Sequence, residues 1–353
     1  MQTVDMLMQE YGLNELQDGL ANLFPDFNLS LEQIMHFIWN GDLSSCFSAL
    51  KEGVLDQFAQ EFISMKSVFI SLLLIGILSA LLSNIAHVFE NKQIADVSFY
   101  FTYLMMIILL LRTFEQAAGT MSSLAQNTVT FMKLFLPTSF MAVGLSSGGV
   151  TAGVVYQILL CAIYLVQVAM SSFLLPAIYC YVFLNMVNGL WMEERFVLLM
   201  DAIKKGVKFI LKAITTAIVG ASVLQSMITP VIDSVKGVAV QKAVSVIPGL
   251  GDIASGVTQM MLGSAVLVKN SIGTCMLIVL VILCAVPLLK LLTIVVLMKG
   301  AAALMGLTAD RRLAGCTDRM GEGSILLLQS AFTILILFMI TIAIVSFTTN
   351  RGF

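Results

Sequence analysis

The stretch Asp233–Lys290 decides the class of fold. It opens with a glycine-rich run, DSVKGVAVQKAVSVIPGLGDIASG (233–256), and ends in an apolar run, LVKNSIGTCMLIVLVILCAVPLLK (267–290). The apolar run also holds polar side chains and a proline: Lys269, Asn270, Lys290 and Pro287. Such residues are costly at membrane depth, and they persist where the backbone is buried in protein or lines a water-filled cavity. The stretch therefore predicts a membrane protein with an internal function, not a simple anchor.

The composition of the whole chain supports this reading. Apolar residues make up 59% of the 353 residues and charged residues 11%, against about 45–50% and 25% in soluble domains. The mean hydropathy is +0.97. We therefore expect an all-α, polytopic membrane bundle. The net charge of −2 argues against a nucleic-acid partner. The cysteines are scattered without a metal-binding spacing, so we expect neither a metal nor a cofactor.

The chain divides into three regions by hydropathy. Residues 1–66 predict a small water-facing helical region, 67–347 a polytopic transmembrane domain, and 348–353 a short tail. Runs of about 20 apolar residues are long enough to cross a bilayer. The predicted spans are Ser67–Phe89, Val97–Ala118, Val150–Leu190, Gly206–Ile228, Ile272–Met298 and Ser324–Phe347. The third is long and contains Pro176, where we expect a break, so it crosses either once or twice.

Basic residues gather in two groups that predict the orientation. One group surrounds Lys204 and Lys205, and the other runs from Lys299 to Arg319. The positive-inside rule places both groups in the cytoplasm. If Val150–Leu190 crosses once, the protein has six crossings and an extracytoplasmic N-terminal region, which is the arrangement we favour. If it crosses twice, the N-terminal region is cytoplasmic.

The prolines suggest an internal repeat. Pro137 and Pro176 are separated by the same number of residues as Pro248 and Pro287. A shift of about 111 residues lays 97–190 over 208–301, with almost no other residue identity, so coincidence stays an alternative. Transporter folds often carry repeats with broken helices at corresponding positions. In a parallel repeat, Pro137 and Pro248 would lie in two short re-entrant or interfacial elements on the outer side.

The candidate site residues come from the polar and proline positions. We take as candidate pore or assembly residues Lys269, Asn270, Lys290, Pro248, Gly249, Gly251, Pro287 and Pro137. The two lysines have a simpler alternative, in which long side chains reach the membrane interface. The run Gly249–Asp252 matches the GxGD motif of intramembrane aspartyl proteases. That chemistry needs a second aspartate facing the first, and none lies inside a predicted span, so we expect no catalytic residues.

The order of these elements resembles a known family. The run DSVKGVAVQKAVSVIPGLG (233–251), followed by LVKNSIG (267–273) and the helix with Pro287 and Lys290, is similar to stage III sporulation protein AE of endospore-forming bacteria. The resemblance implies a membrane component of a channel between mother cell and forespore, in the mother-cell membrane around the forespore. It also implies an ATPase and ring-forming subunits as partners, and it brings no enzymatic residues.

Three functions remain distinct at this point. The first is a structural or conducting subunit of a multiprotein channel or secretion-like complex in sporulation, with self-association left open. The second is a stand-alone secondary transporter with its site between the Pro137 and Pro248 elements. The third, an intramembrane protease, rests on the GxGD match alone and is disfavoured.

Overall fold

The computed structural model describes residues 43–88, 92–147, 149–190, 195–244, 251–308 and 311–347. Apart from two turn residues, these are helical, so the predicted all-α class is confirmed. The elements are α4 (Leu43–Val88), α5 (Lys92–Ser147), α6 (Gly149–Val168), the π-helical η1 (Ala169–Leu174), α7 (Leu175–Leu190), α8 (Val197–Val244), α9 (Gly251–Thr308) and α10 (Arg311–Phe347).

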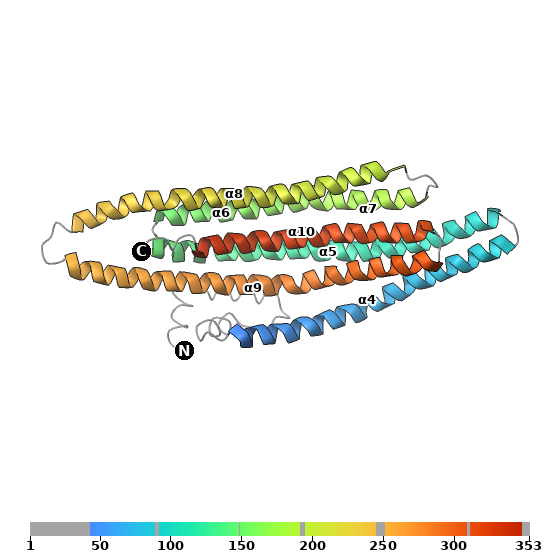
Figure 1. Cartoon of the computed structure of the whole chain (residues 1–353), viewed down its shortest axis with the longest axis horizontal. Helices are drawn as coiled ribbons and strands as arrows, with labels where there is room; N and C mark the ends of the chain where they lie inside the picture. The colour runs from blue at the N-terminus through green and yellow to red at the C-terminus, as the bar shows by residue number, and fades with distance from the viewer. Residues whose placement is uncertain are drawn as a thin grey trace.

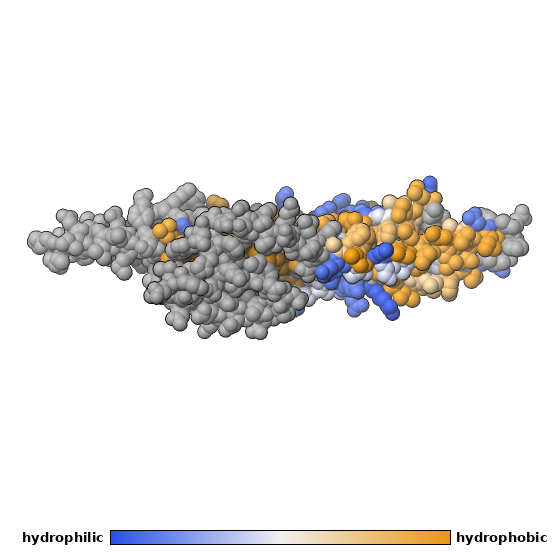
Figure 2. Space-filling model, turned by 90° about the horizontal axis from the view of Figure 1, so that it is seen from below, coloured by the Kyte–Doolittle hydropathy of each residue, from blue (hydrophilic) through white to orange (hydrophobic). Residues whose placement is uncertain are grey.

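The helices run along one long axis (Figure 1). α10 lies among α5, α7, α8 and α9, and it packs most extensively on α9. The ends of α7 and α9 and the starts of α8 and α10 lie at the same end of the bundle, and the end of α4 and the start of α5 extend past them. The face in Figure 2 is strongly apolar at that end, next to a zone of hydrophilic residues.

Five of the described helical stretches are long and apolar enough to cross a membrane. They are Ala59–Ile85, Asp96–Gly144, Ala152–Leu190, Val266–Leu307 and Arg311–Ser346. Five of the six predicted spans overlap them. The sixth, Gly206–Ile228, lies in α8, which is not among the five. The first turns of α8 carry Lys204, Lys205 and Lys208, which lower the hydropathy of its described part.

The predicted break at Pro176 is wrong. α6, η1 and α7 follow one another without a turn, so residues 149–190 form one continuous rod that would cross once. Just after η1, the Leu175 N–H donates to the Met170 carbonyl, five residues back. Proline lacks an N–H and crowds the preceding turn, and a π-helical turn is one way to absorb such a disturbance.

The re-entrant or interfacial element that a repeat would place at Pro137 is not a separate short element. Pro137 lies inside α5 and Pro287 inside α9, and neither proline ends its helix. Membrane helices tolerate proline because local adjustments and neighbouring helices satisfy the freed backbone groups. Pro248 lies outside the described residues. The helix ends do not repeat at a shift of 111, because the counterparts of Val244 and Gly251 fall inside α5.

The predicted boundary at residue 66 falls inside a helix. α4 begins at Leu43 and continues to Val88, so the polar helix expected before residue 66 and the first span are one element. Residues 1–42, with the rest of the predicted N-terminal region, lie outside the described residues.

Several buried hydroxyl side chains are satisfied within their own helices. Thr128, Ser330 and Thr341 are fully buried, and each donates a hydrogen bond to the carbonyl four residues earlier. Large apolar side chains, among them Phe183 and Phe332, point outward instead. Because lipid is as apolar as leucine, membrane helices pack through small and polar residues and turn bulky apolar ones to the lipid. The described bundle follows this pattern.

Gly273 permits the closest approach between α9 and α10. A Cβ atom at Gly273 would collide with the buried Ser346 side chain, whereas a Cβ at Gly153 would meet nothing within 4 Å. We predict that Gly273→Ala lowers the free energy of unfolding by about 1–3 kcal/mol through overpacking. Thermal unfolding in detergent measures this, with Gly153→Ala as the matched control. Equal melting temperatures for the two variants would contradict the prediction.

Candidate functional site, a charged layer between helices

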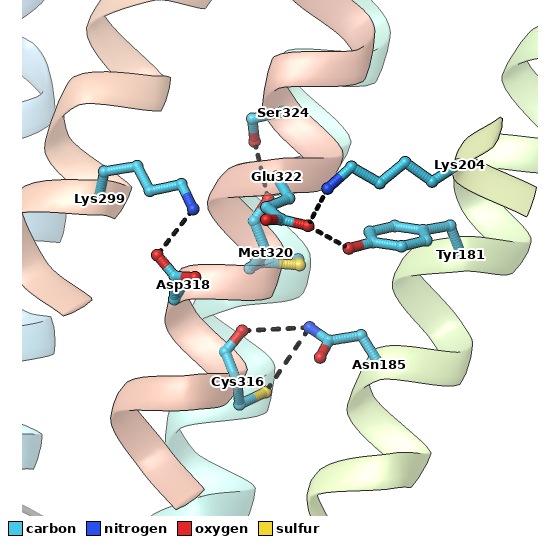
Figure 3. Close-up of polar contacts among 9 residues, drawn as sticks. All are labelled: Tyr181, Asn185, Lys204, Lys299, Cys316, Asp318, Met320, Glu322 and Ser324. Atoms are coloured by element: carbon cyan, nitrogen blue, oxygen red, sulfur yellow. Dashed lines mark hydrogen bonds and ion pairs between the residues drawn. The ribbon is translucent and has the colours of Figure 1, made fainter. Parts of the chain in front are cut away.

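The N-terminal half of α10 carries two acidic side chains one helical turn apart. Asp318 and Glu322 belong to the run DRMGEG (318–323). Asp318 forms a 2.7 Å ion pair with Lys299 of α9. Glu322 forms a 2.7 Å ion pair with Lys204 of α8. Figure 3 shows the two pairs on different sides of α10. The acidic residues of α10 therefore bind α8 and α9.

Glu322 has a second donor. The Tyr181 hydroxyl of α7 donates a hydrogen bond to Glu322 Oε2 at 3.0 Å, the same oxygen that Lys204 binds. Glycines flank Glu322 and let the helices approach: a Cβ at Gly323 would lie 2.7 Å from the Val182 side chain. One carboxylate thus joins α7, α8 and α10.

Neutral hydrogen bonds continue the contact between α7 and α10. Asn185 Nδ2 donates to the Cys316 carbonyl at 3.1 Å (Figure 3). The Tyr103 hydroxyl of α5 donates to the Met186 carbonyl at 2.7 Å. Asn188 Oδ1 accepts from the Phe196 N–H just before α8 begins. Together with the ion pairs, these bonds form a layer of polar contacts near the ends of α7 and α9 and the starts of α8 and α10. We call it the charged layer.

Lys290, a candidate from the sequence, pairs with Glu61 of α4 at 3.3 Å. Lys290 lies well inside the apolar part of α9, while Glu61 lies near the start of the apolar part of α4. Both side chains are partly exposed, at 34% and 19%. The pair therefore joins α4 to α9 at a depth where α9 itself is apolar.

Lys269 lies in a different place. Its side chain is 2% exposed, so it points between helices and does not reach outward. It lines a small pocket with Ser139 of α5 and Ser346 of α10, among apolar neighbours. Asn270 is adjacent, and its Oδ1 atom is buried without a hydrogen bond. The segment around Pro137 borders the same pocket, through Phe135 and Ser139.

The remaining candidates from the sequence are not brought to one site. Gly251 is the first residue of α9, and Pro287 lies in the middle of that helix. Pro248 and Gly249 fall outside the described residues. In the part of the chain whose side chains are described, no group of three or more His, Cys, Asp or Glu residues could hold a metal ion.

Sequence reasoning missed the acidic half of the charged layer. The last span is predicted to begin at Ser324, which leaves both Asp318 and Glu322 outside it. α10 in fact begins at Arg311. A usable signal was present, because acids four residues apart share a helix face. Their lysine partners come from distant parts of the chain, and only the packing of α8 and α9 on α10 assigns them.

The architecture defines the class first: an all-helical, multi-pass membrane protein whose helices are joined by interhelical ion pairs. Sequence comparison then gives the family. The profile of the stage III sporulation protein AE family matches residues 29–349. The chain is similar to stage III sporulation protein AE of Bacillus subtilis (strain 168), with 20% identity over 336 residues, covering 94% of this chain and 83% of that protein. No solved structure matches.

The chain therefore belongs to the stage III sporulation protein AE family, and it is a membrane protein that acts in sporulation. The resemblance inferred from Asp233–Gly273 is confirmed over most of the chain. The family is not known as a family of enzymes.

The Lys204–Glu322 pair gives a quantitative prediction. Both side chains are about 30% exposed, so solvent weakens the pair, and we expect a coupling free energy of about 0.5–1 kcal/mol. A double-mutant cycle with Lys204→Met and Glu322→Gln measures it from unfolding in detergent. Lys205→Met is the matched control, because Lys205 is adjacent and exposed. A coupling as large for Lys205 as for Lys204 would show that no specific pair exists.

The Glu61–Lys290 pair predicts a charge-swap rescue. Glu61→Lys or Lys290→Glu alone places two like charges 3.3 Å apart, and each variant should lower the melting temperature by about 2–4 °C. The double variant restores opposite charges and should regain most of the loss. Lys66→Glu, an exposed position on the same helix, controls for net charge. If the double variant is as unstable as the two single losses added together, the pair does not join α4 to α9.

Proposed function

We propose that the protein is a structural or conducting subunit of a multiprotein, secretion-like channel that acts between mother cell and forespore. The family assignment identifies a membrane protein that acts in sporulation. The proposal adds that this protein works as one subunit of a larger assembly. Its support in the structure is the length of the helices and the way in which they are joined.

Helix length is the observation that carries the proposal. α5 has 56 residues and α9 has 58, which at 1.5 Å per residue corresponds to about 84–87 Å. The hydrocarbon core of a bilayer is about 30 Å thick. Even strongly tilted, such helices extend well outside the lipid. A protein that only needs to cross a membrane gains nothing from this length, whereas a subunit of an assembly can use the protruding parts to bind its neighbours.

The distribution of charge supports an orientation. Arg195, Lys204, Arg311 and Arg312 lie near the connected ends of α7 and α8 or α9 and α10, at one end of the bundle. By the positive-inside rule this end is cytoplasmic. α4 then begins toward the opposite end, with the N-terminal region extracytoplasmic. We place the protein on this basis in the mother-cell membrane around the forespore, with its basic end toward the mother-cell cytoplasm.

This orientation divides the expected partners between the two ends. An ATPase would meet the cytoplasmic end, which holds the charged layer. Ring-forming subunits would meet the extracytoplasmic end, which holds the end of α8 and the start of α9. The charged layer is suited to a structural role, because its ion pairs and hydrogen bonds connect α5, α7, α8, α9 and α10 and stabilise one arrangement of these helices.

One observation favours the second function, a stand-alone transporter. The pocket formed by Lys269, Ser139 and Ser346 combines a buried cation with hydroxyl groups and lies beside the Pro137 segment. A transporter of this type would bind an anionic solute there. The pocket is small and lined mainly by apolar side chains, so we keep the channel subunit as the preferred function.

We predict that cells lacking this protein complete engulfment and then fail to sustain late gene expression in the forespore. The wild-type gene should restore heat-resistant spore formation. Affinity purification of a tagged, functional protein from crosslinked sporulating cells should recover an ATPase and ring-forming subunits. The matched control is the same tag on an unrelated multi-pass protein of the mother-cell membrane.

Two results would separate the alternatives. If the purified protein alone moves a solute into liposomes, and Lys269→Ala abolishes that movement, the transporter function replaces the channel subunit. Normal sporulation in the deletion strain would contradict a role as an essential channel subunit.

A further inference from the structure

α8 carries a row of lysines on its outer side. Lys205, Lys208 and Lys212 recur at intervals of three and four residues, so they lie within about 60° of one another around the helix axis. Lys208 and Lys212 are exposed, and Lys205 is partly exposed. Lys204 points elsewhere and pairs with Glu322. The ion pairs among the described residues include none of these three lysines. We call them the lysine row.

The lysine row extends into the apolar level of the bundle. Leu211, next to Lys212, lines a small apolar pocket with Met170 of η1 and Thr333 of α10. Met170 and Thr333 both lie well inside helical stretches that are long and apolar enough to cross a membrane. Lys212 is also about 12 Å further along α8 than Lys204 of the charged layer. A bilayer around these helices therefore encloses the level of Lys212, where an unsolvated charge is costly.

The outer side of α8 at this level also differs from a lipid-facing surface. Elsewhere the described bundle turns bulky apolar side chains outward, among them Phe183 and Phe332. On α8, Phe209 is 72% exposed, but it lies nearer the charged layer. Beyond it, the exposed residues are mostly small or polar: Lys212, Ala213, Thr216, Ala217, Val219 and Gly220. Membrane helices turn such residues toward protein or water, and charged residues toward water-filled cavities.

We propose that the outer side of α8 lines a water-filled pathway through the membrane, and that the lysine row makes this pathway favour small anionic solutes. Water keeps the ammonium groups of Lys208 and Lys212 solvated at membrane depth. Pores that select anions carry Lys or Arg side chains along their walls. α8 lies at one edge of the bundle (Figure 1), so the opposite wall belongs to another molecule. The inference rests on the proposed function, because it gives the conducting subunit a surface and a class of solute.

Cysteine labelling in membranes tests the pathway. Thr216, one turn beyond Lys212, is replaced by cysteine in the full-length protein, with the six native cysteines changed to alanine. Phe332→Cys, at a similar level on α10 and 47% exposed, is the matched control. Broken membranes from sporulating cells are treated with a charged methanethiosulfonate reagent. We expect Thr216→Cys to react at least about tenfold faster than Phe332→Cys, because a thiol in apolar surroundings stays protonated.

Two results would overturn the pathway. Equally slow reaction of Thr216→Cys and Phe332→Cys would show that lipid or a partner helix covers the outer side of α8. Equally fast reaction would show that this level lies outside the lipid. If Thr216→Cys does not accumulate, Ala213→Cys probes the same side. Heat-resistant spores from a cysteine strain show that the proposed function is intact, so a negative labelling result in that strain counts against the pathway alone.

The preference for anions is tested at the same cysteine. An anionic and a cationic methanethiosulfonate reagent are compared at Thr216→Cys, with and without Lys212→Gln. At about 6 Å, one charge in water changes each rate about threefold, in opposite directions. We therefore expect Lys212→Gln to lower the ratio of the anionic to the cationic rate about tenfold. Lys66→Gln, at an exposed position of α4 on the opposite edge of the bundle, should leave the ratio unchanged. Equal effects of Lys212→Gln and Lys66→Gln would overturn the preference.

Discussion

The carboxylate of Glu322 joins three helices at the basic end of the bundle. It accepts hydrogen bonds from both the Lys204 ammonium and the Tyr181 hydroxyl. These bonds link α7 and α8 to α10. Asp318, four residues earlier, does the same for α9 through Lys299. Two acids on one helix therefore connect α10 to α7, α8 and α9. In a membrane protein, where apolar contacts hardly distinguish lipid from protein, such polar contacts specify the arrangement.

The rest of the bundle follows a different rule. Several of its buried hydroxyl groups, such as those of Ser330 and Thr341, bond to their own helix backbone. Because such a bond lies within one helix, it allows close packing without selecting a neighbouring helix. Gly273 and Gly323 add contacts that a side chain would block. Small residues thus set the distance between helices, and the few ionised residues set their identity and register.

The structure also changes how the apolar segments are understood. Sequence hydropathy treats every apolar run as equivalent, and it predicted six crossings of one membrane. Phe69 of α4 lies against Gly300 of α9, and Arg312 of α10 lies over the ring of Phe99 of α5, so the first two runs pack beside the ends of the later ones. Five of the described helical stretches, not six, are long and apolar enough to cross a membrane.

The sequence by itself determined the class of protein, because the free energy of transferring a helix into lipid depends mainly on the hydrophobicity of its residues and on the length of the apolar run. Both can be read from the sequence. It also determined the family, through the pattern from Asp233 to Gly273, and it identified Lys269 and Lys290 as unusual. It could not assign Glu61 to Lys290, or Glu322 to Lys204, since these partners are separated by more than 100 residues. It also misjudged Pro137 and Pro176, because a proline's effect depends on whether the surrounding backbone can compensate. Those outcomes were decided by tertiary packing, which alone brings distant charges together and supports the backbone around a proline.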